Sequence, residues 1–398
     1  MRRSIVVAFI VTLATAGASA DTTDPKPAPA PAPQAALSWR QAQLFADVFA
    51  KLRAEYVDPV DDSVLIDLAL RGMLAGLDPH SAYLAPEEFR ELDDLTRGSY
   101  DGVGLDLVVE GYGLRVVEPL PGSPAARAGL LRGDVVTAID GKPIASLDPT
   151  DALGLLRGNV GSAVEISVRH EGASESTPVK LKRERVRVSS VTASVLEPGF
   201  LHLRISQFSS TTARDLAKAL ATLTKDGPPR GVVLDLRGNG GGIFDSAVEV
   251  ADLFLEDGLI VSSEGRAPDA SFVRHANAGD ALSGAPLVVL VDKATASAAE
   301  IVAGALKDQH RGVVIGSATY GKGSVQTVLP LAQGGALKFT SARWRTPSGQ
   351  PIPLTGIEPD IPLDALPISS GGTALAQLDP ALAQALLAVK AAKLARAN

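Results

Sequence analysis

The sequence predicts an α/β core that carries an inserted, mostly β module and is preceded by a helical region. Two runs, Val232–Leu236 and Leu287–Val291, are apolar at nearly every position and alternate with helical patterns, as expected for strands covered on both faces. Between about Asp101 and Arg185, short alternating runs are interrupted by glycine, which indicates a compact β module. From Ser38 to about Leu95, apolar residues recur at spacings of three and four, which predicts amphipathic helices.

The composition limits the kinds of protein that this chain can be. It has 398 residues, 45% of them apolar, which is enough for two or three domains with cores of their own. It contains no cysteine, which excludes disulfides, a thiol nucleophile and cysteine metal sites. The formal charge of -7 comes without a long basic stripe, so the sequence argues against a nucleic-acid partner.

The first twenty residues, MRRSIVVAFIVTLATAGASA, have the pattern of a secretory signal peptide. Two arginines precede an apolar run that is too short to span a bilayer, and Ala18 and Ala20 form an A-x-A cleavage site. No cysteine follows that could carry a lipid. We therefore expect cleavage after Ala20 and a periplasmic protein without a stable membrane span. Loss of the two arginines takes the charge from -7 to about -9.

Six segments follow from the pattern along the chain. The stretch after the signal peptide is rich in proline and alanine, which favours an extended linker. An Ala/Leu-rich helix is expected at the end, from about Asp379 to Ala397. The predicted segments are a signal peptide (1–20), a linker (21–37), an N-terminal helical region (38–100), the β module (101–186), the α/β core (187–366) and a C-terminal helical tail (367–398).

Ser297 has two interpretations. With Glu300 three positions later and an apolar run directly after it, Ser297 has the capping-box spacing that opens many ordinary helices. The other interpretation is a nucleophile for acyl transfer. A nucleophile needs a general base and oxyanion donors, which must come from elsewhere in the chain.

We expect the base to be a lysine rather than a histidine, because none of the five histidines lies in HExxH or another paired metal spacing. Lys322, flanked by glycines, ends an irregular turn before an apolar strand, and burial would lower its pKa as a base requires. One alternative is an exposed turn lysine. The other is a phosphate loop, which we reject because glycine follows the lysine and a strand follows in place of a helix.

The tract RGNGGG supplies candidate oxyanion donors. Its glycines lie between an apolar strand and a helix, where exposed N–H groups can converge on a developing negative charge. The N–H of Ala298, at the start of the helix that Ser297 opens, is a second donor. The alternative is a glycine-rich turn without a ligand. The glycines concerned are Gly238, Gly240, Gly241 and Gly242.

The joint order is a glycine tract, a serine at a helix start and a lysine 25 residues later. In this order the chain resembles the bacterial C-terminal processing peptidases, also called tail-specific proteases, from about Phe45 to Asp360. The resemblance implies a serine endopeptidase with an α/β core of the ClpP/crotonase-like kind. The blocks that resemble the family, in its order, are YVDPVDD, RGMLAGLDPHSAYL, GVGLDL, PGSPAARAGLLRGDVVTAIDG, VLDLRGNGGG, SAAEIVAGALKD, YGKGSVQ and TPSGQPIPLTGIEPDI.

Carried over by position, the resemblance implies Ser297 as the nucleophile, Lys322 as the general base and Gln326 as the residue that orients the lysine. A neutral amide can hold a lysine amine without the charge that would raise its pKa. The oxyanion donors would be the backbone N–H groups of Gly241 and Ala298.

Three further positions qualify this assignment. Gly240 stands where many relatives have proline, which leaves open which glycine of residues 240–242 donates. Thr295 is a nearby hydroxyl whose spacing to Glu300 does not match the family's nucleophile. His80 lies in the block LDPHSAYL, and we expect it to be structural.

The β module resembles a PDZ domain inserted in the protease. Its carboxylate-binding loop would be Gly102, Val103, Gly104 and Leu105, whose N–H groups would capture a peptide C-terminus while the peptide adds a strand to the sheet edge. The alternative is a simple turn that opens a strand.

The expected partners are polypeptides with apolar C-termini, delivered directly or by an adaptor protein. A second copy of the chain is also expected, because apolar helices at both ends favour a homo-oligomer. Neither a metal nor a cofactor is implied. We also expect a resting state with a misaligned site, which a peptide or partner shifts to the active one.

Two rival functions are compatible with parts of the sequence. One is a catalytically inactive PDZ scaffold that binds protein C-termini in the envelope, which the intact Ser297, Lys322 and Gln326 disfavour. The other is a histidine-dependent serine protease with a PDZ module, which the absence of a G-x-S-x-G serine near a suitable histidine disfavours.

Overall fold

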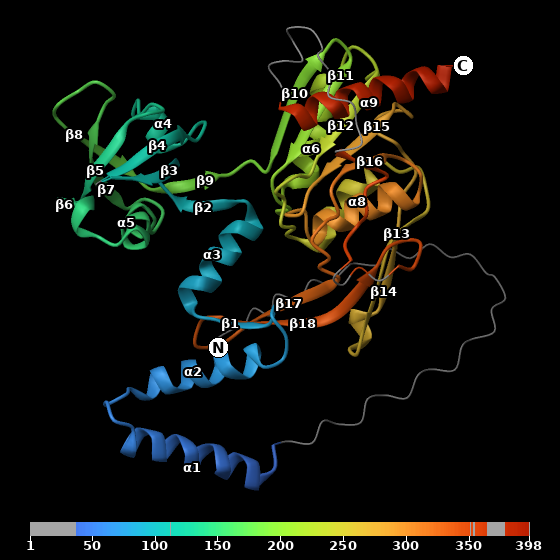
Figure 1. The fold of residues 1–398 in the computed structure, drawn as a ribbon. Coiled ribbons are helices and arrows are strands. Elements are labelled where there is room, and N and C mark those ends of the chain that lie inside the picture. The colour runs from blue at the N-terminus through green and yellow to red at the C-terminus, as the bar shows by residue number, and fades with distance from the viewer. Residues whose placement is uncertain (1–36, 112, 351, 353–354, 364–378, 398) are drawn as a thin grey trace, which may run out of the picture. The chain divides into compact units, whose positions relative to one another are not determined.

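The computed structural model describes residues 37–111, 113–350, 352, 355–363 and 379–397 (Figure 1). The predicted signal peptide and nearly all of the predicted linker lie outside these residues. The chain divides after Leu65 into two units. In the first unit, helix α1 (Trp39–Glu55) begins after Ser38, whose hydroxyl accepts the N–H of Gln41 at 3.4 Å, and α1 has no buried residue.

Helix α2 (Asp62–Ala75) begins in the first unit and continues into the second, where α3 (Pro86–Arg97) follows. The short strand β1 (Ala82–Leu84) lies between these helices and pairs with a strand far along the chain. The predicted helical region 38–100 is therefore not wholly helical. Three residues without a helical period, whose partners lie about 250 positions later, gave no local signal of a strand.

A six-stranded sheet forms the centre of the second unit, in the order β10-β11-β12-β15-β16-β19. Five of these strands run parallel, namely β11, β12, β15, β16 and β19, and β10 is antiparallel at one edge. The strands are β10 (Val191–Glu197), β11 (Phe200–Ile205), β12 (Gly231–Asp235), β15 (Leu287–Val291), β16 (Val313–Gly316) and β19 (Ile361–Pro362).

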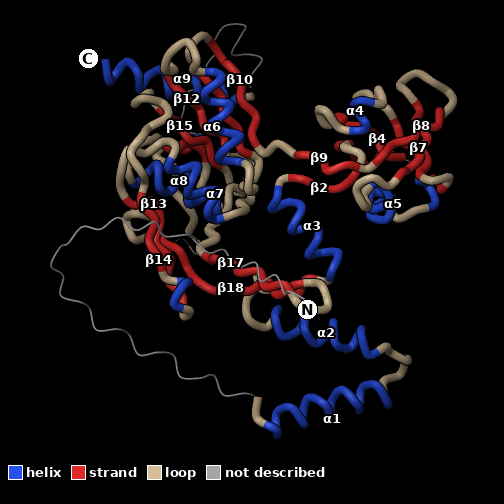
Figure 2. Tube along the Cα trace, turned by 180° about the vertical axis from the view of Figure 1, so that it is seen from behind, coloured by secondary structure: helices blue, strands red, loops and turns tan. Residues whose placement is uncertain are grey.

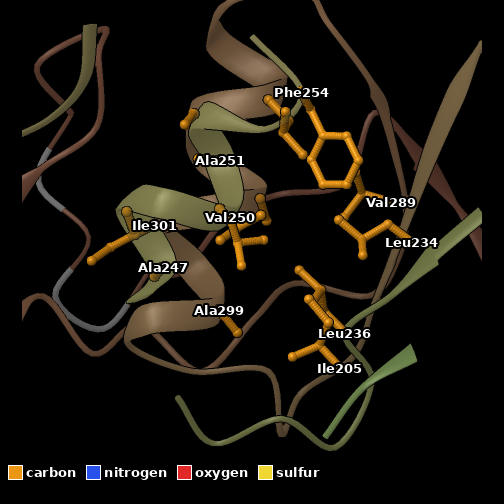
Figure 3. Close-up of a cluster of buried hydrophobic side chains, with 14 of the residues drawn as sticks. Ile205, Leu234, Leu236, Ala247, Val250, Ala251, Phe254, Val289, Ala299 and Ile301 are labelled. Atoms are coloured by element: carbon orange, nitrogen blue, oxygen red, sulfur yellow. The ribbon is translucent and has the colours of Figure 1, made fainter. Parts of the chain in front are cut away.

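Helices cover both faces of this sheet. Leu234 packs on the face formed with α6 (Thr212–Leu223), α7 (Phe244–Asp252) and α8 (Ala298–Asp308), where Val250 and Phe254 also lie (Figure 3). Val233, the neighbouring residue, points to the opposite face and packs with α9 (Pro380–Ala397), drawn in red in Figure 1. The prediction from consecutive apolar residues, that these strands are covered on both sides, is confirmed.

Helix α9, which was expected to have an exposed apolar face, packs against the central sheet. Residues such as Leu382, Leu386 and Val389 are buried in the core against the sheet. The apolar face of this helix is therefore occupied within the chain, so it is not exposed for the self-association that the sequence suggested at both ends. None of the helices in the described ranges is long and apolar enough to cross a membrane.

A second, five-stranded sheet is antiparallel throughout, in the order β1-β18-β13-β14 with β17 also paired to β18 (Figure 2). The strand expected directly after Lys322 is β17, whereas β13 and β14 were not predicted. The strands beyond β1 are β13 (Leu259–Gly265), β14 (Phe272–His275), β17 (Ser324–Pro330) and β18 (Ala336–Arg345).

The small β module has its own sheet and its own apolar core. The chain enters it through β2 (Ser99–Gly102) and leaves through β9 (Glu184–Arg187), and the two strands pair antiparallel. The module's other elements are β3 (Leu105–Glu110), β4 (Gly113–Pro119), α4 (Pro124–Arg127), β5 (Val135–Ile139), β6 (Lys142–Pro143), α5 (Pro149–Leu156), β7 (Ala163–Arg169) and β8 (Thr177–Lys182).

The central sheet offers a stability test. Leu234 is 0% exposed between helices and strands, so Leu234→Ala should lower the free energy of unfolding by about 2–5 kcal/mol through lost burial and a cavity. Val195, on the edge strand of the same sheet, is 54% exposed, and Val195→Ala should cost about 0.5 kcal/mol or less. Urea denaturation measures both, and equal losses would contradict this assignment of the core.

Candidate active site

The carboxyl ends of β12 and β15 lie side by side, so the loops that follow them meet. The glycine tract occupies the first loop and Ser297 ends the second. Three hydrogen bonds join the loops, from the Ala296 N–H to the Asn239 carbonyl (2.9 Å), from the Gly238 N–H to the Asp292 carboxylate (3.0 Å) and from the Thr295 hydroxyl to the Leu236 carbonyl (2.9 Å).

Ser297 is not an ordinary helix cap. Its φ of 54° and ψ of -115° place it in a region that serine rarely occupies. The carboxylate of Glu300 accepts the Ser297 N–H at 2.6 Å, which is one half of a capping box, but the Ser297 hydroxyl makes no cap hydrogen bond. The strained backbone holds this hydroxyl at the start of α8, and the hydroxyl is not used as a helix cap.

The Glu300 carboxylate gathers the parts of the site. It is 0% exposed, and one of its oxygens accepts the N–H groups of both Ser297 (2.6 Å) and Lys322 (2.9 Å). Its other oxygen accepts the Thr319 hydroxyl (2.6 Å) and the Gly321 N–H (2.7 Å). The two residues predicted as nucleophile and base are therefore tied by their backbones to a single carboxylate oxygen.

Lys322 lies two residues before β17 begins, so the strand predicted after it is present, and within the described residues a strand stands where a phosphate loop requires a helix. Its carbonyl accepts the indole N–H of Trp344 at 3.0 Å, which fixes its backbone to β18. Burial lowers the pKa of Lys322, and so does the charge of Lys338, while Glu300 and Asp78 act in the opposite direction. The net lowering favours the neutral amine that a general base needs.

The side-chain amide of Gln326, on β17, makes hydrogen bonds through its nitrogen and none through its oxygen within the described residues. Its Nε2 donates to the hydroxyls of Thr340 (2.9 Å) and Ser324 (3.2 Å). Its Oε1 is buried and has no hydrogen-bond partner within the described part of the chain. A buried acceptor without a partner costs free energy, so this oxygen favours a hydrogen-bond donor. The role predicted for Gln326 implies that this donor is the amine of Lys322.

A segment that the sequence analysis treated as structural borders Lys322. Asp78 accepts the Ser81 hydroxyl (2.7 Å) and the His80 N–H (2.8 Å), and Ser81 accepts the N–H of Thr340 on β18 (3.2 Å). Burial raises the pKa of Asp78, but these hydrogen bonds outweigh it and bring the pKa to about 2. Burial and then the charge of Lys322 lower the pKa of His80.

These neighbours were missed because they are distant in sequence. The block LDPHSAYL is recognisable in the sequence, but no local pattern places His80 beside a lysine more than 240 positions later.

Gly241 is one of the two predicted oxyanion donors, and its N–H already has an acceptor in this structure. The Gly241 N–H donates to the side-chain oxygen of Asn239 at 2.9 Å, so in this structure it is not free to bind an oxyanion. Gly241 does lie against the serine, because a Cβ built on it would be 2.8 Å from the Ser297 Cβ and 3.0 Å from the Ala298 nitrogen. Ala298 supplies the first N–H of α8, which has no acceptor within its own helix.

The predicted carboxylate-binding loop spans the end of β2 and the start of β3. Val103 is buried, and its carbonyl accepts the Ala125 N–H at 2.9 Å. Gly104 has a φ of 80°, and a Cβ there would overlap Ser123 at 2.1 Å, so glycine is required. The Val103 carbonyl therefore faces the module's interior.

Comparison with known proteins identifies the class. Residues 199–363 match Peptidase family S41, and residues 115–170 match a PDZ domain, so the molecule combines a peptidase with a PDZ domain. The chain belongs to the carboxy-terminal processing proteases, a family of serine proteases, as its sequence motifs suggested.

Two curated relatives and one solved structure illustrate the match. The carboxy-terminal-processing protease of Bartonella bacilliformis is 39% identical over 81% of this chain and 75% of its own. The carboxy-terminal processing protease CtpA of Bacillus subtilis is 31% identical over 91% of this chain and 78% of its own. The photosystem II D1 C-terminal processing protease aligns with 86% of this chain and 98% of its own, at 33% identity and a TM-score of 0.49.

Replacement of Glu300 tests whether one carboxylate holds the site together. In Glu300→Gln an amide NH₂ replaces one oxygen and faces donors, so at least one buried hydrogen bond is lost. We expect a loss of about 2–4 kcal/mol in unfolding free energy and a severe loss of peptidase activity. Glu358→Gln, at an exposed position, should change neither. Unchanged stability and activity in Glu300→Gln would contradict the role given to this residue.

Two neighbouring glycines provide a matched pair. Gly241 has a φ of 103° and its added Cβ would meet Ser297 and the Ala296 carbonyl below 3.0 Å, whereas a Cβ at Gly240 would meet nothing within 4 Å. Gly241→Ala should therefore reduce kcat/KM by about 100-fold or more, and Gly240→Ala by less than about threefold. Peptide hydrolysis measures both, and equal activities would refute the close approach of Gly241 to the serine.

Proposed function

We propose that the chain is an exported serine endopeptidase that binds C-terminal tails of envelope proteins through its PDZ domain and cleaves them with a Ser297/Lys322 site. The observation that carries this proposal is the oxygen of Glu300 that binds the backbones of both residues. The unpaired Oε1 of Gln326 supports the same assignment, because it offers the lysine amine a neutral acceptor.

In the proposed cycle, neutral Lys322 takes the proton of the Ser297 hydroxyl as its oxygen attacks a peptide carbonyl. The resulting oxyanion is bound by the Ala298 N–H, and the Lys322 ammonium then protonates the leaving amine as the C–N bond breaks. Water attacks the acyl-enzyme with Lys322 again as base, which releases the product acid and restores Ser297. Gln326 holds the lysine in place through its Oε1.

We further propose that the structure corresponds to a resting state. A complete oxyanion site has two or more donors, and the second donor, Gly241, is occupied by Asn239. Release of the Gly241 N–H from Asn239 would complete the site beside Ala298. This step is consistent with the misaligned resting state expected from the sequence.

The remaining parts of the proposal rest on the sequence. Export to the periplasm follows from the signal-peptide pattern, and polypeptides with apolar C-termini follow from the PDZ domain. We assign the core to the ClpP/crotonase-like kind. We propose a homo-oligomer formed through the N-terminal helices, among which α1 has no buried residue.

Variants and pH test the Ser/Lys mechanism together. Ser297→Ala and Lys322→Ala should each lower kcat on an unstructured protein with an apolar tail by about 1,000-fold or more. Lys293→Ala removes an exposed lysine of the same loop and should leave kcat unchanged. Because the neutral amine is the active form and its pKa is lowered, activity should rise with pH to a midpoint below the usual lysine value of about 10.4.

The pH profile also separates this site from a histidine-dependent one. A midpoint near 6.5, together with activity surviving in Lys322→Ala, would indicate a histidine base and would overturn the assignment. Activity surviving in Ser297→Ala would return this serine to the role of a helix cap.

A further inference from the structure

The side-chain amide of Gln326 is held at its nitrogen end by two hydroxyls. Gln326 lies directly opposite Thr340 in the pairing of β17 with β18, so the two side chains share one face of the sheet. The Gln326 Nε2 donates to the Thr340 Oγ1 at 2.9 Å and to the Ser324 Oγ at 3.2 Å. Its Oε1 is buried and has no hydrogen-bond partner among the described residues.

Lys322 belongs to the same face of this sheet. The Trp344 N–H donates to the Gly323 carbonyl at 3.0 Å, so the pairing with β18 extends one residue before β17 begins. Since side chains alternate along a strand, Lys322 lies on the face that carries Gln326. Lys338, two residues before Thr340 on β18, also lies on this face. In agreement with this, burial lowers the pKa of Lys322, and the charge of Lys338 adds to the lowering.

The orientation of the amide decides whether it can hold the base. The two ends of a glutamine amide have nearly the same shape, but the oxygen only accepts hydrogen bonds and the nitrogen only donates them. With its oxygen toward Lys322, Gln326 can accept a hydrogen from the lysine amine. In the reverse orientation its NH₂ would face the ammonium, and two donors would meet. A hydroxyl that accepts from Nε2 therefore keeps the amide in the orientation that the base requires.

Thr340 is itself fixed by a turn that is distant in sequence. Its backbone N–H donates to the Ser81 Oγ at 3.2 Å, and the buried Ser81 hydroxyl donates to the Asp78 Oδ2 at 2.7 Å. The Asp78 Oδ1 accepts the N–H groups of His80 (2.8 Å) and Ser81 (2.9 Å). Although burial raises the pKa of Asp78, its hydrogen bonds bring the pKa to about 2, so it is ionised and can only accept. The Ser81 hydrogen thus points to Asp78, and its lone pairs remain for the Thr340 N–H.

We propose that Thr340 is a positioning residue of the general base. Its hydroxyl keeps the nitrogen of the Gln326 amide on the β18 side and thereby presents the oxygen to the Lys322 amine. The turn of residues 78–81 keeps Thr340 in place. The inference rests on the Ser/Lys site proposed above and deepens it, since the base then depends on a segment more than 240 positions away in the chain.

Substitution of Thr340 tests this role. Thr340→Val removes the hydroxyl and keeps the size of the side chain. On an unstructured fluorogenic peptide that ends in valine and two alanines, kcat should fall about tenfold, the size expected of one hydrogen bond, with KM unchanged. Thr340→Ser keeps the hydroxyl and should stay within about threefold of the unmodified chain. Thr340→Ala removes the same hydroxyl and gives the same comparison if the valine methyl group is not accommodated.

Thr327→Val is the matched control. The Thr327 hydroxyl donates to the Ser341 Oγ at 2.7 Å at an exposed position, on the opposite face of the same strand pair. Its loss should leave kcat and KM unchanged.

A double-mutant cycle shows whether Thr340 acts through Gln326. Gln326→Met removes both ends of the amide, so addition of Thr340→Val to this variant should change kcat by less than about twofold. A tenfold fall in both backgrounds would show that Thr340 supports only the strand pair, and would overturn the inference. Equal kcat in Thr340→Val and the unmodified chain would overturn it as well.

The pH profile of kcat provides a second readout. An acceptor beside the ammonium favours the charged form of lysine, so its loss should move the midpoint to lower pH in Thr340→Val. Gln326→Met should show the same shift, and the double variant no more. A fall in kcat without a shift of the midpoint would overturn the positioning role. Activity surviving in Lys322→Ala would instead overturn the Ser/Lys site itself, so the two failures are distinguishable.

Discussion

The site depends on one buried carboxylate. Glu300 accepts four hydrogen bonds, one from the start of α8 and three from the loop before β17, and none of its surface is exposed to water. An ionised carboxylate without partners would be too costly to bury, whereas each hydrogen bond to a charged group contributes about 1.5–3 kcal/mol. The fold can therefore hold Glu300 only if the Ser297 loop and the turn before β17 both reach it, which fixes the distance between them.

The same tether makes the strain at Ser297 tolerable. A positive φ at serine costs on the order of 1–3 kcal/mol and persists only where the surroundings over-determine it. Here the Ser297 N–H is held by Glu300, and the preceding residue is held by the Asn239 carbonyl. Gly241 fills the remaining space so closely that no side chain fits there. The glycine tract therefore provides the surface on which Ser297 packs.

Sequence patterns predicted the local elements of the structure but not the contacts between residues that are distant in sequence. The strands Val232–Leu236 and Leu287–Val291 and the start of α8 follow from apolar runs and cap spacing, and family motifs pointed to Ser297, Lys322 and Gln326. The capping-box spacing identified Glu300 but concealed its larger role, since three of its four donors come from residues 319–322. Asp78, Ser81 and Thr340 could not be placed beside the site, because only the pairing of β1 with β18 brings them there.

Neutrality of Lys322 requires that nearby carboxylates do not form an ion pair with it. Glu300 and Asp78 both raise its pKa through their charges, yet within the described residues neither makes a salt bridge to its amine. Each oxygen of Glu300 accepts two hydrogen bonds from hydroxyl and amide donors, and the oxygens of Asp78 accept hydrogen bonds from Ser81 and His80. Burial and Lys338 then prevail. The acceptor left open beside β17 is the neutral Oε1 of Gln326, which can hold the amine without stabilising its protonated form as a carboxylate would.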